Sequence, residues 1–140
     1  MITTAGENLL LGLICGAVAP PPNLYLALLT APATPFSSGW DIQEPLVAEY
    51  KRTKIQNSPG FWMLSDGEMV NAKALSLPFA FSAEPWPILM GWGMLDAETG
   101  GSLFWAGAWG KQIRPGAKDY ITIPSGGLAI RAAAAGGWSG

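Results

Sequence analysis

The sequence contains no histidine and a single cysteine, Cys15. Without histidine the chain lacks the commonest general base, the Ser-His and Cys-His nucleophile pairs, and the commonest metal ligand. One cysteine cannot form an intramolecular disulfide, and alone it cannot build a soft-metal site. We therefore expect no catalytic residues, no metal and no cofactor. Because Cys15 lies in an apolar run, we expect its thiol to be buried and unreactive.

Charge is scarce as well. Only 13% of the 140 residues are charged, about half of the roughly 25% in ordinary soluble domains. No Lys or Arg precedes Lys51, and no basic stretch could neutralise a row of phosphates, which argues against nucleic-acid binding. Hydrophobic residues make up 49% of the chain and include 7 tryptophans. Such composition is typical of interface cores, so we expect other subunits to cover part of the surface.

Long hydrophobic runs are also missing. The best membrane candidate, residues 9–19, is shorter than the roughly 18–20 apolar residues that span a bilayer, so we expect no membrane insertion. Thr4 and Glu7 have the spacing of a capping box, and leucines follow at helical intervals until Gly16 and a proline run. The pattern predicts a buried helix over about residues 4–15, followed by an extended linker.

After the linker, short apolar runs alternate with turn residues. Residues 23–30 are predicted to form a buried strand, and residues 49–55 a strand with one solvated face. The Asp66-Gly67 pair predicts a tight hairpin, and residues 86–109 predict a longer one. The Tyr50-Lys-Arg52 step is interpreted as the polar face of its strand rather than as a basic recognition patch.

Seven to eight short strands can be assigned, with a turn signal about every ten residues. This pattern predicts a mainly β fold: a single small antiparallel β-sandwich, or a partly open barrel, with one N-terminal α-helix. The domain, including the helix, is expected to span residues 1–132. The low-complexity residues 133–140 are expected to form a flexible C-terminal tail.

The aromatic residues are the main candidates for binding. Trp40 and Phe36 lie in a Pro-, Ser- and Gly-rich loop, and Trp138 lies in the tail, where burial within the domain is not expected. These three are the candidate interface residues. Trp92 and Trp105 lie on opposite arms of the longer hairpin, where core packing is favoured, although their flat faces could also stack on a glycan.

The remaining candidates for a catalytic or metal-binding site are carboxylates. Asp96 and Glu98 could form a hydrolase pair, but their place in a predicted turn favours a turn-forming role for Asp96. Asp41, Glu44 and Glu49 carry oxygen ligands for a hard cation, yet they lack the regular spacing of a calcium loop.

The motifs occur in a distinctive order. A Leu-rich helix and a Pro-containing link precede NLYLALLTA at residues 23–31, and a loop then ends in AEYKR at residues 48–52. Residues 91–105 read GWGMLDAETGGSLFW. This order resembles that of small bacteriophage virion proteins commonly labelled tail fibre proteins, over nearly the whole chain. The sequence departs from their usual pattern at residues 46–49, where glycines are usual, and at Trp92, where Phe is usual.

The resemblance implies a non-enzymatic virion structural protein (a tail, tail-fibre, neck or capsid-associated subunit) that is assembled in the host cytoplasm. Its expected partners are other virion proteins and further copies of itself in a homo-oligomer. One alternative is a receptor- or carbohydrate-binding module on the virion surface, which would bind a host-surface glycan. A carboxylate-dependent glycan hydrolase is a further alternative, and it requires an acidic pair about 5–10 Å apart across a cleft.

Overall fold

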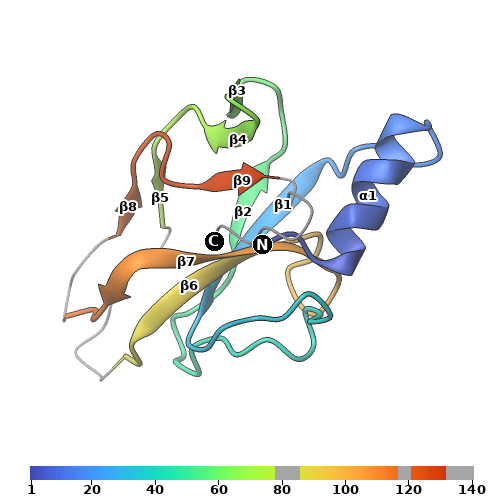
Figure 1. Cartoon of the computed structure of the whole chain (residues 1–140). Coiled ribbons are helices and arrows are strands. Elements are labelled where there is room, and N and C mark those ends of the chain that lie inside the picture. Colours follow the sequence, from blue (N-terminus) through green and yellow to red (C-terminus); the bar gives the residue numbers. More distant parts are fainter. Residues whose placement is uncertain (78–85, 117–120, 132–140) are drawn as a thin grey trace.

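The computed structural model describes residues 1–77, 86–116 and 121–131, and the chain there forms one helix and nine strands (Figure 1). The elements are α1 (Thr4–Ile14), β1 (Asn23–Leu29), β2 (Thr53–Gln56), β3 (Trp62–Ser65), β4 (Glu68–Asn71), β5 (Leu75–Ser76), β6 (Leu89–Leu95), β7 (Leu103–Ile113), β8 (Thr122–Ile123) and β9 (Ala129–Arg131). All the strand pairs among them are antiparallel. The predicted mainly β fold with an N-terminal helix is confirmed.

The strands form three sheets. A central sheet has the order β2-β1-β6-β7, a second sheet the order β3-β4-β9, and β5 pairs with β8. Figure 1 shows the central sheet crossing the molecule, with β3, β4 and β9 above it and α1 to one side. The two outer strands of the central sheet, β2 and β7, do not pair with each other, so this sheet does not close into a barrel. The arrangement therefore corresponds only partly to a simple two-sheet sandwich.

The inner strands of the central sheet, β1 and β6, are buried on both faces, which explains the nearly continuous apolar sequence of β1. Leu24, Leu26 and Leu28 face the main core, which also contains residues of β8 and β9. Ala27 and Leu29 point to the opposite face. There a second, smaller core comprises Ala27, Leu29, Leu95, Leu103 and Ala106, with Met1, Ala33 and Ile42 packed against it. Since Ala33 and Ile42 belong to the loop 31–45, this loop covers the second face of the sheet.

Both predicted hairpins are present. In the β3–β4 turn, Asp66 and Gly67 have φ values of 49° and 78°, as a type I′ turn requires. In the β6–β7 turn, Gly100 and Gly101 have φ values of 63° and 80°. Turn residues that tolerate positive φ therefore fixed the register of both hairpins.

The helix differs from the prediction in its cap and in its burial. Its N-cap is Thr3 rather than Thr4, because the Thr3 hydroxyl accepts the Gly6 N–H at 3.0 Å. Of the helical residues only Gly6 is buried, against the backbone of β7, while Ile14 is 83% exposed. The predicted buried helix is thus wrong: beyond Gly6 the helix is at most half-buried, with Leu9 packed against the main core. Cys15 is exposed as well, which corrects the expectation of a buried thiol.

Some predictions fall on residues that the structure does not describe. These are the tail 133–140 with Trp138, and residue 132 at the end of the expected domain.

Candidate functional site

The loop 31–45, which carries Phe36 and Trp40, is fixed to three other parts of the fold. Three backbone hydrogen bonds of 2.9 Å hold it: Thr30 N–H to Gln43 O, Thr4 N–H to Pro35 O, and Gly39 N–H to Gly101 O. They connect the loop to the end of β1, to the start of α1 and to the β6–β7 turn. The loop is therefore an ordered part of the domain surface rather than a loose connection.

A buried arginine lies beneath the loop. Arg52 is 6% exposed, and its guanidinium makes five hydrogen bonds, one for each of its N–H groups. It donates to both carboxylate oxygens of Glu44, at 2.9 and 3.0 Å, and to the carbonyl of Gly39 at 3.0 Å. It also donates to the carbonyls of Ala97 and Gly100, each at 2.8 Å. Arg52 thereby holds the loop 31–45 against the β6–β7 turn.

Tyr50 completes this buried cluster. Its hydroxyl donates to Glu44 Oε1 at 2.6 Å and accepts the Leu28 N–H at 3.2 Å. Burial, with the neighbouring Glu44 carboxylate, raises the pKa of Tyr50 well above its ordinary value, so the hydroxyl stays protonated. Tyr50 and Arg52 precede β2 and turn inward, and only Lys51 between them is exposed. Both the recognition patch and the polar strand face considered for this step are therefore wrong.

Trp40 lies flat against the turn that Arg52 holds. A Cβ placed on Gly100 would overlap the Trp40 ring, coming within 2.6 Å of Cη2. The indole nevertheless remains 77% exposed, because its other face is open. Phe36 on the same loop is 84% exposed. Phe36 and Trp40, two of the three candidate interface residues, therefore lie exposed on a hydrogen-bonded loop, and their predicted exposure is confirmed.

The surroundings of Trp40 are acidic. Within residues 31–46 and 96–102, the exposed ionisable side chains are Asp41, Asp96 and Glu98. Asp96 Oδ1 accepts the Ser102 N–H at 2.8 Å, which fits its assignment as a turn-forming residue. Glu44, the remaining carboxylate of these segments, is paired with Arg52.

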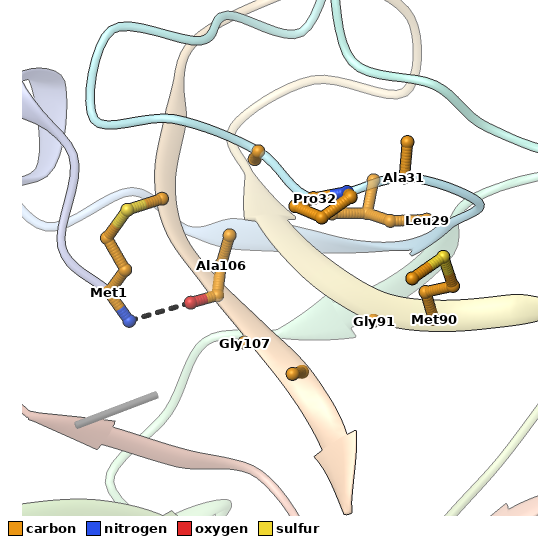
Figure 2. Close-up of a pocket in the computed structure, with 10 residues that line it drawn as sticks. Met1, Leu29, Ala31, Pro32, Met90, Gly91, Ala106 and Gly107 are labelled. Carbon is orange, nitrogen blue, oxygen red and sulfur yellow. Dashed lines mark hydrogen bonds between the residues drawn. The ribbon is translucent and has the colours of Figure 1, made fainter. Parts of the chain in front are cut away.

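An apolar hollow lies on the second face of the sheet, beside the start of the same loop (Figure 2). Small side chains form much of its wall: Ala31, Ala33, Ala106 and Ala108. Figure 2 shows the Met1 amino group at its edge, donating to Ala106 O at 2.7 Å. Its volume of about 130 Å³ is below the roughly 300–1,000 Å³ of small-molecule sites. The hollow therefore has no room for a drug-sized ligand.

The two tryptophans of the longer hairpin are packed. Trp92 is 4% exposed and lies over Gly107, where an added Cβ would be 2.6 Å from its ring. It has no open face to offer a sugar. Trp105 is half-buried opposite Met94 and lines an apolar groove of about 320 Å³ between α1 and the β3–β4 hairpin. Its Nε1 has no hydrogen-bond partner among the described residues.

The acidic residues considered for a cation site are engaged elsewhere. Asp41 accepts the Ser38 N–H at 2.8 Å, and Glu49 accepts the Trp86 Nε1–H at 2.8 Å. Throughout the described ranges, no three His, Cys, Asp or Glu side chains are grouped so that they could hold a metal ion. In that same part of the chain, no helix is long and apolar enough to cross a membrane.

Sequence reasoning missed Arg52 as the residue that organises this site. Three of its five hydrogen bonds go to backbone carbonyls. Every residue has a backbone carbonyl, so the sequence does not indicate which ones Arg52 bonds. The sequence contained one indication of this ion pair: Arg52 follows the acidic loop residue Glu44 by only eight positions.

Comparison with known proteins identifies the family. A search of curated proteins returned no match. The family model described as "Podophage GP4 fiber I protein gp80" matches residues 1–131, which is nearly the entire chain and contains the loop, Arg52 and the β6–β7 turn. This match confirms the resemblance to phage fibre proteins that the motif order indicates. The chain belongs to the Gp80 family of podophage GP4 fiber I proteins, and is thus a phage fibre-type virion component.

Proposed function

We propose that this protein is a non-enzymatic structural subunit that assembles with other virion proteins and with copies of itself through the loop 31–45. The observation that carries the proposal is the exposure of Phe36 and Trp40 on a loop whose backbone is fixed by Arg52. Membership of a phage fibre family supports the structural role. The same proposal places assembly in the host cytoplasm, without nucleic acid or membrane insertion.

The loop 31–45 is already ordered before a partner binds. Ordering a loop at the moment of binding consumes part of the interaction energy, and a loop that is already fixed avoids this loss. Large aromatic side chains are the residues that most often dominate interface energetics. The Trp40 ring rests on Gly100 with one face and remains 77% exposed, so its other face is presented to solvent.

The non-enzymatic part of the proposal is supported by the state of the acidic groups. Glu44 is neutralised by Arg52, Glu49 bonds Trp86, and Asp96 bonds the backbone of its own turn. Proton transfer requires a carboxylate that can approach a substrate. These three make structural bonds, whereas Asp41 and Glu98 lie exposed on the surface around Trp40.

Self-association can be tested by light scattering over a concentration series of purified protein. We expect a defined oligomer that dissociates in the Trp40→Ala variant and persists in the control variant Leu11→Ala. Leu11 is 64% exposed on α1, so this control removes a comparable exposed apolar side chain outside the loop. A wild-type protein that stays monomeric at all concentrations would contradict the self-assembly part.

A second candidate function is a glycan-binding module, and one observation favours it. The open face of Trp40 is also a surface on which a sugar ring can stack. A glycan array probed with wild-type protein and Trp40→Ala distinguishes this function, because it predicts wild-type signals that the variant loses.

A further inference from the structure

We propose that Trp40, with Asp41 and Glu98, forms a docking surface for a cationic side chain, an arginine, of a partner virion protein. This inference rests on the proposed function and names the chemistry of the partner surface. The occupant would stack on the open indole face and bond the neighbouring carboxylates.

The geometry begins with the two segments that meet at Trp40. Gly39 N–H donates to Gly101 O at 2.9 Å, so the loop and the turn lie side by side. The indole covers Gly100 with one face. Asp41 follows Trp40 directly, and Glu98 precedes Gly100 by two residues. The carboxylates therefore belong to the two segments that frame the ring.

Charge complementarity identifies the occupant. Asp41, Asp96 and Glu98 are exposed. Arg52 does not offset their charge at the surface, because it is buried and paired with Glu44. The exposed charge of residues 31–46 and 96–102 is therefore wholly negative. A partner surface that covers it must bring positive charge, or it would leave carboxylates desolvated and unpaired.

The exposed ring selects the shape of that cation. A guanidinium is planar, stacks on an aromatic face and can donate to carboxylates at its edge at the same time. An ammonium group makes the same electrostatic contact without the planar stacking. The surface of Trp40 with acidic groups beside it is thus better matched to arginine than to lysine or to an uncharged sugar.

The fixed loop makes the surface specific. Arg52 bonds the carbonyl of Gly39, next to Trp40, and the carbonyl of Gly100 beneath the ring. One buried side chain therefore bonds the backbone of both segments that carry the exposed carboxylates. The docking surface is built before the partner arrives.

The test uses the full chain labelled with ¹⁵N, with the Trp40 indole N–H resonance assigned by its loss in Trp40→Phe. The probes are the peptide acetyl-Gly-Arg-Gly-amide and its citrulline counterpart, which has nearly the same shape without the charge. We expect a saturable shift of the Trp40 resonance with the arginine peptide, and at least five-fold weaker binding of the citrulline peptide. Higher salt should weaken the arginine peptide further.

Two variants separate local charge from overall charge. The double variant Asp41→Asn/Glu98→Gln keeps an oxygen acceptor for the Ser38 N–H, and it should bind the arginine peptide at least five-fold more weakly than wild type. The control Asp66→Asn removes an exposed carboxylate from the β3–β4 turn and should bind like wild type.

Equal binding of the two peptides, or no saturable shift with either, overturns the inference. Tighter binding of a neutral sugar such as N-acetylglucosamine, seen as a saturable shift of the Trp40 resonance, overturns the inference in favour of the glycan-binding function. These outcomes do not depend on incorporation into virions, and the titration uses protein at a concentration where light scattering finds the monomer, so that no second copy covers Trp40. Failure of this inference is therefore distinguishable from failure of the proposed function.

Discussion

Arg52 and Glu44 form a two-point ion pair beneath the exposed loop, with Nε to Oε1 at 2.9 Å and Nη2 to Oε2 at 3.0 Å. Only 4% of the Arg52 side chain and 21% of the Glu44 side chain are exposed. The planar fork of arginine matches a carboxylate in this way. Its remaining donors bond Gly39 O in the same loop and the carbonyls of Ala97 and Gly100 in the β6–β7 turn. Arg52 thus reinforces the Gly39 N–H to Gly101 O hydrogen bond that joins the loop to the β6–β7 turn.

Replacing Arg52 by methionine should lower the free energy of unfolding by about 3 kcal/mol or more, because Glu44 and three carbonyls lose their donor in a buried site. Lys51→Met is the matched control, since Lys51 is adjacent and exposed, and it should change stability by less than about 0.5 kcal/mol. Urea unfolding measures both values. Equal stabilities of the two variants would contradict the role assigned to Arg52.

Replacing Gly100 by alanine should displace the Trp40 ring. The added Cβ overlaps the ring, and the φ of 63° adds backbone strain. Gly126 has a φ of 81° with no atom near the same position, so Gly126→Ala reports the strain alone, which is roughly 1–2 kcal/mol. Gly100→Ala should exceed this control by at least about 0.5 kcal/mol, which is less than the roughly 1–3 kcal/mol of a filled core because the exposed Trp40 ring can partly move aside. Similar losses in urea unfolding would mean that Trp40 does not rest on Gly100.

Replacing Gly107 by alanine should destabilise the protein by about 1–3 kcal/mol, because the new methyl group meets the Trp92 ring in a filled core. Trp92→Phe removes the ring atoms that collide, so alanine at position 107 should be tolerated better in that background. A double-mutant cycle measured by urea unfolding should give a coupling energy of at least about 0.5 kcal/mol. Additive effects would argue against this contact.

Stability should fall at alkaline pH because of Tyr50. The pKa of Tyr50 is raised on folding by burial and by Glu44, so the unfolded chain loses this proton first. The stabilisation is fully present below the unfolded pKa of about 10 and is lost progressively as pH rises above it. Tyr50→Phe should lack this component. Urea unfolding of both proteins from pH 8 to 11 measures the difference, and parallel pH profiles would refute it.

The elements that depend on local sequence were predictable. The Asp66-Gly67 turn, the long β6–β7 hairpin and the buried β1 strand follow from residues that tolerate positive φ and from apolar runs. The exposed positions of Phe36 and Trp40 followed from their place in a loop between strands.

The features that depend on distant contacts were not predictable. Arg52 bonds carbonyls of residues 39, 97 and 100, and any residue at those positions supplies a carbonyl. Cys15 is exposed because it follows the last helical residue, Ile14, which is itself 83% exposed, and an apolar run does not reveal how far a neighbouring element extends. The burial of Arg52 and the exposure of Cys15 are thus tertiary properties.

The claim that the loop 31–45 joins the protein to the virion is tested most directly by measuring the number of copies of this protein in purified virions. The measurement compares phage that carry wild-type, Trp40→Ala/Phe36→Ala and Leu11→Ala proteins, after all three have shown equal melting temperatures in isolation. Quantitative mass spectrometry should find at least a five-fold loss for the loop variant and wild-type copy number for the control. Full incorporation of the loop variant would contradict the claim that this loop joins the protein to the virion.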